Sequence, residues 1–68
     1  MTYTDLTRRL SRLGVVFRRQ ARGSHEVWWH PGRQLYTMIP NHRGDLKKGT
    51  LAKILRDLGI SEDDLRGA

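Results

Sequence analysis

The stretch VVFRRQARGSHEVWWHPGRQLYTMI, residues 15–39, decides the fold of this chain, because it contains three strand-like runs separated by two breaks. Branched and aromatic side chains favour extended backbone in the first run, residues 15–20, and Arg-Gly-Ser at 22–24 interrupts it. The second run covers His25–His30 and the third covers Leu35–Ile39. Three such runs in close succession are typical of an antiparallel meander.

The connections after the second and third runs have signals of their own. Pro31 and Gly32 suit the two central positions of a type II turn. Pro40 ends the third run, and residues 41–47 follow as a polar, basic loop. Loops of this kind often carry function.

A helix is predicted before the strands. Leu6, Leu10 and Leu13 recur at helical spacing, which indicates an amphipathic helix over residues 4–13. Thr4 is the expected N-cap, and Gly14 is the expected C′ residue in a left-handed conformation.

Two further helices are predicted after the strands. One ends at Gly59 and the other is a short helix through Leu65, which begins after Ser61 and its three acidic neighbours. The first of these has apolar residues at i, i+3, i+4 and i+7: Leu51, Ile54, Leu55 and Leu58.

The order helix, three strands, helix, short helix predicts a two-layered α+β fold, α-β-β-β-α with a three-stranded antiparallel sheet. The double-stranded-RNA-binding domain is the best known fold with this order. The 68 residues are expected to form a single domain, 1–68, with no cysteine to cross-link it.

The charge of the chain points to polyanionic partners. Its net charge is +6, and contacts between basic side chains and phosphates release counterions, so nucleic acid is the first candidate and an acidic protein surface the second. No run approaches the roughly 20 apolar residues of a membrane span, and residues 1–13 are too polar for a signal peptide. We therefore expect a cytoplasmic protein with no membrane partner.

Histidines are the candidates for acid–base chemistry, because only their side chains titrate near neutral pH in this chain. His25 follows Gly23-Ser24 at the start of a strand, where it either takes part in catalysis or is simply exposed. His30 and His42 flank turns, where a histidine usually forms a local hydrogen bond. Spacings of five and twelve residues between the three match no common zinc pattern, so neither a metal nor another cofactor is expected.

Basic residues open the helix that follows the strands. Lys47-Lys48-Gly49-Thr50 lies where unpaired N–H groups and the helix dipole attract phosphate, although a solvated basic face is an equally good interpretation.

Trp28 and Trp29 are neighbours in one strand, so they point to opposite faces of the sheet and one of them is exposed. The exposed tryptophan is interpreted as an anchor for a protein partner, since proteins that read single strands generally offer several aromatic side chains.

Several short motifs occur together over nearly the whole chain, and in this combination the chain resembles the HicA (YcfA-like) messenger-RNA interferase toxins. Glu26 departs from the family pattern, and a carboxylate beside the histidine would either repel phosphate or make the ring more basic. Leu65 stands where an aromatic residue is commoner. The motifs are Gly23-Ser24-His25, Trp28, His30-Pro31, Ile39-Pro40, His42, and Leu46–Leu51 followed by Ile54-Leu55.

The resemblance implies a fold similar to the double-stranded-RNA-binding domain, cleavage of messenger RNA, and neutralisation by a HicB-like antitoxin of a type II toxin–antitoxin system. The family's catalytic histidine is His25 here. We expect metal-independent cleavage, with RNA bound by Ser24, Arg43, Lys47, Lys48 and Thr50.

Two other functions remain open on the sequence alone. The same fold order and basic helix start would serve a non-catalytic binder of double-stranded RNA, in which His25 is dispensable. A protein-interaction module with a positive face is compatible with the toxin interpretation.

Overall fold

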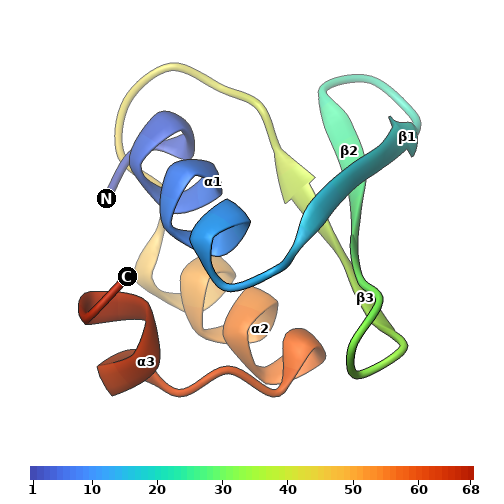
Figure 1. Ribbon diagram of the computed structural model, residues 1–68. Helices are drawn as coiled ribbons and strands as arrows, with labels where there is room; N and C mark the ends of the chain where they lie inside the picture. The colour runs from blue at the N-terminus through green and yellow to red at the C-terminus, as the bar shows by residue number, and fades with distance from the viewer.

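The middle of the chain forms a three-stranded antiparallel sheet in the order β1-β2-β3, which confirms the meander (Figure 1). The computed structural model describes all residues, 1–68, and has the α+β arrangement expected from the sequence. Its elements are α1 (Tyr3–Arg12), β1 (Val16–Gln20), β2 (His25–His30), β3 (Leu35–Pro40), α2 (Lys48–Leu58) and α3 (Glu62–Arg66).

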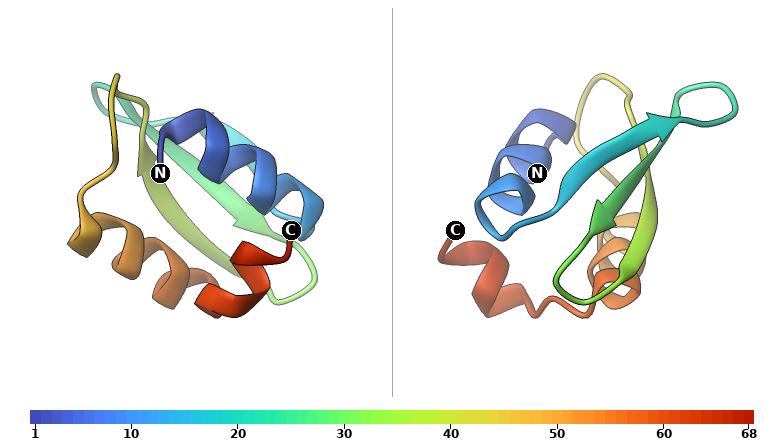
Figure 2. Two further views of the ribbon diagram at one scale, coloured as in Figure 1. Left: turned by 90° about the vertical axis from the view of Figure 1, so that its left-hand side faces the viewer. Right: turned by 45° about the vertical axis from the view of Figure 1, so that its right-hand side comes forward.

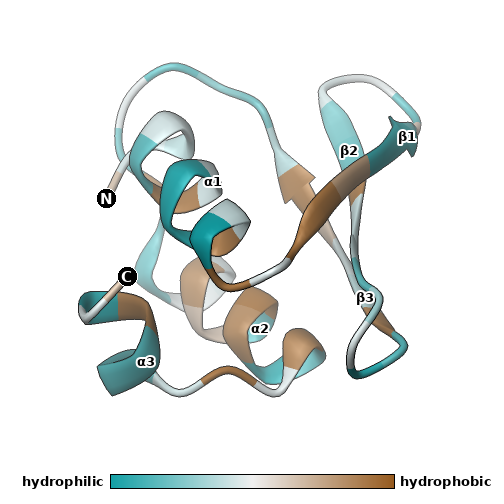
Figure 3. Cartoon of the chain, in the orientation of Figure 1, coloured by the Kyte–Doolittle hydropathy of each residue, from teal (hydrophilic) through white to brown (hydrophobic).

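Helices α1 and α2 lie on one side of the sheet and leave the other side open (Figure 2). Alternate residues of each strand face the helices, and the brown, apolar sides of both helices turn toward the sheet (Figure 3). None of the three helices is long and apolar enough to cross a membrane. The core consists of Leu6, Leu10, Val15, Trp28, Ile39, Ile54, Leu55, Leu58, Ile60 and Leu65.

The two tryptophans divide between the faces of the sheet. Trp28 is 7 % exposed and belongs to the core, while Trp29 pairs with Val16 and Tyr36 on the opposite side. The β1 register shifts at Arg18, a β-bulge, and the guanidinium carbon of Arg18 lies 5.0 Å from the centre of the Trp29 ring. We call the side that carries Val16, Val27, Trp29, Tyr36 and Met38 the open face.

The N-cap of α1 lies two residues earlier than expected, and the helix begins at Tyr3. The hydroxyl of Thr2 accepts a hydrogen bond from the Asp5 N–H at 3.2 Å, so Thr2 is the N-cap and the assignment to Thr4 was wrong. Both threonines can cap a helix, and Thr2 has an acidic residue three positions later, as in a capping box. Gly14, with φ of 91°, follows the helix in the expected left-handed conformation.

The hairpin between β2 and β3 is not a type II turn. That turn needs positive φ at Gly32, whereas the residue with positive φ is Gln34, at 55°. The His30 carbonyl accepts hydrogen bonds from the N–H groups of Arg33 and Gln34 at 3.3 and 2.8 Å. The connection therefore uses all four residues 31–34, and its left-handed residue comes directly before β3.

The loop from 41 to 47 passes beside the start of the chain. Thr2 forms an antiparallel bridge with Asp45, and the Leu46 N–H donates to the Met1 carbonyl at 2.8 Å. These contacts fix the loop between the end of β3 and the start of α2.

Candidate functional site

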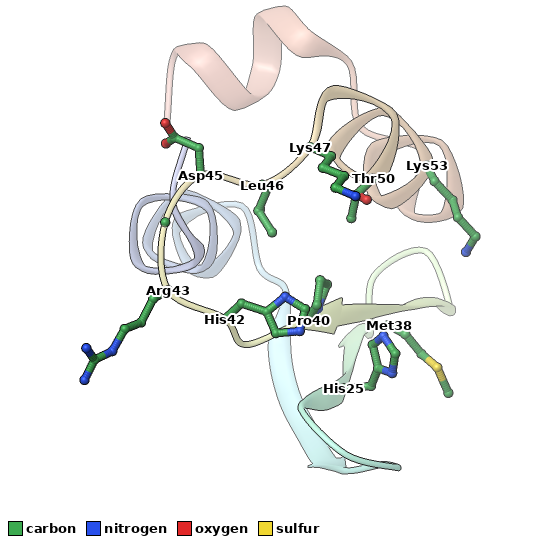
Figure 4. A pocket seen from close by; sticks show the side chains of 11 residues that line it. His25, Met38, Pro40, His42, Arg43, Asp45, Leu46, Lys47, Thr50 and Lys53 are labelled. Carbon is green, nitrogen blue, oxygen red and sulfur yellow. The ribbon is translucent and has the colours of Figure 1, made fainter.

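A cavity of about 640 Å³ opens where the sheet meets the start of α2 (Figure 4). His25, the first residue of β2, pairs with Pro40, the last of β3, and the loop after β3 runs from there to α2. The cavity is lined by His25, Met38, Pro40, His42, Arg43, Gly44, Asp45, Leu46, Lys47, Thr50 and Lys53.

Four of the six residues expected to form the site line this cavity: His25, Arg43, Lys47 and Thr50. The His25 ring lies on the sheet side, opposite the α2 residues, whereas the Arg43 side chain points away from the ring (Figure 4).

The other two expected residues lie outside the cavity lining. Ser24 is half-buried beside the cavity, and its hydroxyl contacts a side chain that lines it. Lys48 is the exposed first residue of α2 and does not reach the cavity.

The cavity is positively charged. Arg43, Lys47 and Lys53 outnumber Asp45, which gives three positive groups against one negative. Lys47 is the N-cap of α2, and its side chain accepts no hydrogen bond from the first N–H groups of the helix. Unpaired N–H groups and the positive end of the helix dipole favour an anion here.

One of these cations, Lys53, is paired with the carboxylate of Asp57, which also lies on α2. Lys53 Nζ donates to Asp57 Oδ2 at 2.8 Å, and this bond lowers the pKa of Asp57 below its ordinary value. A hydrogen bond from the Thr37 hydroxyl at 2.9 Å lowers it further, against the opposing effect of burial. Lys53 itself remains largely exposed at the cavity edge.

The cavity residues that the sequence-based site left out include His42 and Lys53, whose side chains can carry a positive charge. His42 Nε2 lies 2.7 Å from the Ser24 hydroxyl, which is 18 residues away in sequence. A local hydrogen bond was expected for His42, and this bond is not local. The antiparallel pairing of β2 with β3 was the available signal, since it brings the residues after Pro40 next to the start of β2. For Lys53, the signal was its position one helical turn after Thr50.

His30 lies at the far end of β2 from the cavity, beside the hairpin. Its Nδ1 is buried and has no hydrogen-bond partner, so the expected local bond is not formed. The three histidines do not come together as a metal-binding cluster.

Glu26 does not face the cavity, so the expectation that it would repel phosphate was wrong. Neighbouring residues on a strand point to opposite sides, and Glu26 turns toward the helices while His25 turns to the cavity. Its carboxylate accepts hydrogen bonds from the Tyr3 hydroxyl at 2.6 Å, the Trp28 indole at 3.0 Å and the Asn41 amide at 3.1 Å.

The hydrogen bonds of Glu26 change its own pKa and that of the Tyr3 hydroxyl. Burial alone would raise the pKa of Glu26, but the three hydrogen bonds together bring it below its ordinary value. Burial, together with the hydrogen bond to Glu26 and its negative charge, raises the pKa of Tyr3 to about 12. Glu26 is therefore a charged residue at the junction of α1, β2 and the 41–47 loop.

Comparison with known proteins identifies the family. No curated protein sequence matches this chain. The family model described as the HicA toxin of bacterial toxin–antitoxin systems matches residues 3–60, from the start of α1 to just beyond α2, and so covers most of the chain, cavity included. Such toxins have an antitoxin partner. The chain belongs to the HicA toxin family.

Proposed function

We propose that this protein is a metal-independent endoribonuclease that cleaves messenger RNA at the cavity and acts as the toxin of a type II system. The observation that carries the proposal is that His25 faces Lys47 and Thr50 across one positively charged cavity. An acid–base group and an anion-binding helix start are thus placed around a space that suits a phosphodiester.

His25 is the catalytic residue in this proposal. It takes the proton from a ribose 2′-hydroxyl or gives one to the departing 5′-oxygen. The 2′-oxygen forms a bond to phosphorus, the bond from phosphorus to the 5′-oxygen breaks, and the products carry a 2′,3′-cyclic phosphate and a 5′-hydroxyl. DNA lacks the attacking hydroxyl and is spared.

Cations and hydroxyls around His25 bind the RNA. Lys47 and the N–H groups of the first turn of α2 hold the phosphate, and they stabilise the extra negative charge of the phosphorane. Lys48, Arg43, Thr50 and Ser24 complete the RNA contacts, with Lys48 binding a phosphate outside the cavity.

The test is cleavage by the parent protein beside His25→Ala, in cells as growth arrest and in vitro on a purified transcript. We expect the parent to cut RNA, and a folded His25→Ala, checked by circular dichroism, to retain RNA binding while losing cleavage. Products that carry a 5′-phosphate would contradict attack by the 2′-hydroxyl. If both proteins bind double-stranded RNA equally and neither cuts, the protein is a binder of double-stranded RNA instead.

The proposed partner is a HicB-like antitoxin that covers the open face and the cavity in the cytoplasm. Tyr36 is 60 % exposed and Met38 44 % exposed, and Met38 lies on both the open face and the cavity wall. Arg18 already stacks on Trp29, which makes this a surface for apolar side chains and carboxylates rather than for bases. The expectation that one tryptophan is exposed was wrong, because Trp28 is buried and Trp29 is half-buried beneath Arg18.

Binding to this face can be separated from cleavage. Tyr36→Ala should weaken the complex with a co-expressed HicB-like antitoxin by tenfold or more, as expected for a central aromatic contact worth about 2 kcal/mol. The variant should cut RNA like the parent, since Tyr36 does not line the cavity. An unchanged affinity, measured by titration calorimetry, would place the antitoxin elsewhere.

A further inference from the structure

The loop that carries His42 is tied to both sequence neighbours of His25. Ser24 Oγ lies 2.7 Å from His42 Nε2, and the Ser24 carbonyl accepts the Asn41 N–H at 2.9 Å. On the other side, the Asn41 side-chain amide donates to Glu26 Oε2 at 3.1 Å. Three hydrogen bonds therefore fix where His42 sits relative to His25.

Both rings face the same space. His25 comes from the start of β2 and His42 from the loop after β3, and both line the cavity, with Lys47 and Thr50 facing them from α2 (Figure 4). His30, the remaining histidine, does not line it.

Cleavage by a 2′-hydroxyl requires two proton transfers on opposite sides of phosphorus, because the attacking and leaving oxygens are roughly in line. One group must accept the proton of the 2′-hydroxyl, and another must donate a proton to the departing 5′-oxygen. A single imidazole would have to reach both oxygens, whereas two histidines around one phosphate can serve one each.

We propose that His42 is a second catalytic residue, which divides the two proton transfers with His25. The inference rests on the proposed ribonuclease function. Ser24 acts as a positioning residue: its hydroxyl accepts a hydrogen bond from Nε2–H, both in the neutral ring that carries its single proton on Nε2 and in the protonated ring. The bond to Ser24 therefore survives when the proton is gained or lost at Nδ1.

The first experiment compares single-turnover cleavage of a synthetic RNA oligonucleotide that contains one mapped cleavage site. His42→Ala should lower the cleavage rate by about 10²–10⁴-fold, the usual contribution of a general acid or base, with little change in RNA affinity. His42→Gln retains an amide near Ser24 and should show the same loss if the alanine variant is unstable. His30→Ala is the matched control and should cut within about threefold of the parent.

The second experiment replaces the departing 5′-oxygen at the mapped bond with sulfur, since a thiolate leaves without being protonated. Only the variant that lacks the general acid should then recover, so one of His25→Ala and His42→Ala should approach the parent rate while the other stays slow. The recovery identifies the acid, and the slow variant identifies the base.

Ser24 provides a third measurement. At saturating protein, where RNA binding does not limit the rate, Ser24→Ala should slow cleavage about tenfold in the parent but hardly at all in His42→Ala, because its effect on the chemical step acts through the His42 ring. Ser24→Thr, which keeps the hydroxyl, should restore most of the activity.

The outcomes separate this inference from the ribonuclease proposal. If the parent protein does not cut RNA, both the ribonuclease proposal and the proposed role of His42 are wrong. If the parent cuts and His25→Ala does not, then a His42→Ala variant as fast as the parent would remove only the inference. Two variants that respond alike to the sulfur substitution would also overturn it.

Discussion

Glu26 has three hydrogen bonds from three parts of the chain, and at the residue scale these bonds decide how its neighbourhood is arranged. Tyr3 belongs to α1, Trp28 to β2 and Asn41 to the loop after β3. A buried carboxylate is costly unless its oxygens are bonded, so all three donors are needed together. Glu26 thus holds the helix, the strand and the loop in one position while His25 faces the cavity.

Replacing the carboxylate should destabilise the fold. Glu26→Gln keeps the shape but loses the charge, and it sets one amide N–H₂ against another at Asn41. We expect a loss of about 1–3 kcal/mol in the free energy of unfolding, measured by urea denaturation. Ser61→Ala, which removes only an exposed helix cap, should cost about 1 kcal/mol and serves as a reference. A Glu26→Gln variant as stable as the parent would show that the bonds contribute nothing net.

The pKa of Tyr3 can be measured directly, because the chain has two tyrosines and Tyr36→Phe leaves one. The ultraviolet absorbance of this variant should titrate with a midpoint of about 12. Since the folded pKa lies above the unfolded value of about 10, the stabilisation is complete below pH 10 and is lost as the pH rises toward 12. A midpoint near 10 would mean that the Tyr3 hydroxyl is neither buried nor hydrogen-bonded to Glu26 in solution.

At the scale of elements, the strands were the best predicted part and the ends of helices the least. The second run, His25–His30, matches β2 residue for residue, because aromatic and branched side chains between two breaks leave little freedom. The start of α1 was misplaced since Thr2 and Thr4 compete for one role. The hairpin was misassigned because its left-handed residue is Gln34, which has no intrinsic preference for positive φ.

The candidate site was predictable only where one segment supplies it. Lys47 and Thr50 were found because a helix start is visible in sequence. His42 was not, because its position in the cavity depends on the β2–β3 pairing and on a contact with Ser24, 18 residues away in sequence. A pattern within one segment of the sequence does not predict which residues of two different strands the sheet register brings together.

Gly59, the C-cap of α2, and Gly49, in its first turn, should respond in opposite ways to substitution by alanine. Gly59, with φ of 67°, ends the helix, and a Cβ there would lie 3.0 Å from an Arg33 side-chain nitrogen; we expect Gly59→Ala to cost about 1–2 kcal/mol. Gly49 lies in the first turn with open space around it, so Gly49→Ala should stabilise the protein by about 0.4–1 kcal/mol. Thermal unfolding of both variants checks the pair; equal shifts would contradict the left-handed requirement at Gly59.

At the scale of the whole molecule, a net charge of +6 is carried by a body that measures 27 × 22 × 18 Å. Basic residues occur on β1 and on all three helices as well as in the loops, so overall charge alone does not locate the proposed RNA site. The cavity is distinguished by cations that gather beside an acid–base group, and their contribution to binding depends on salt.

The number of cations that contact RNA phosphates can be measured from the salt dependence of RNA affinity. In the His25→Ala background, which prevents cleavage, Lys47→Gln should make the slope of log affinity against log salt shallower by about 0.7, the value for one phosphate contact on a single strand. Arg66→Gln on α3, outside the cavity, should leave the slope unchanged. Equal slopes for parent and Lys47→Gln would mean that Lys47 contacts no phosphate.

The bulge at Arg18 also bears on whether the free protein stays monomeric. β1 is an edge strand, and a flat edge offers its unpaired N–H and C=O groups to an identical strand of another copy. The register shift bends this edge, and an antiparallel pairing of two β1 strands centred on Arg18 and Arg19 would bring like charges together. Pairing of two copies through their β1 edges is thereby disfavoured, even when no partner covers the apolar open face.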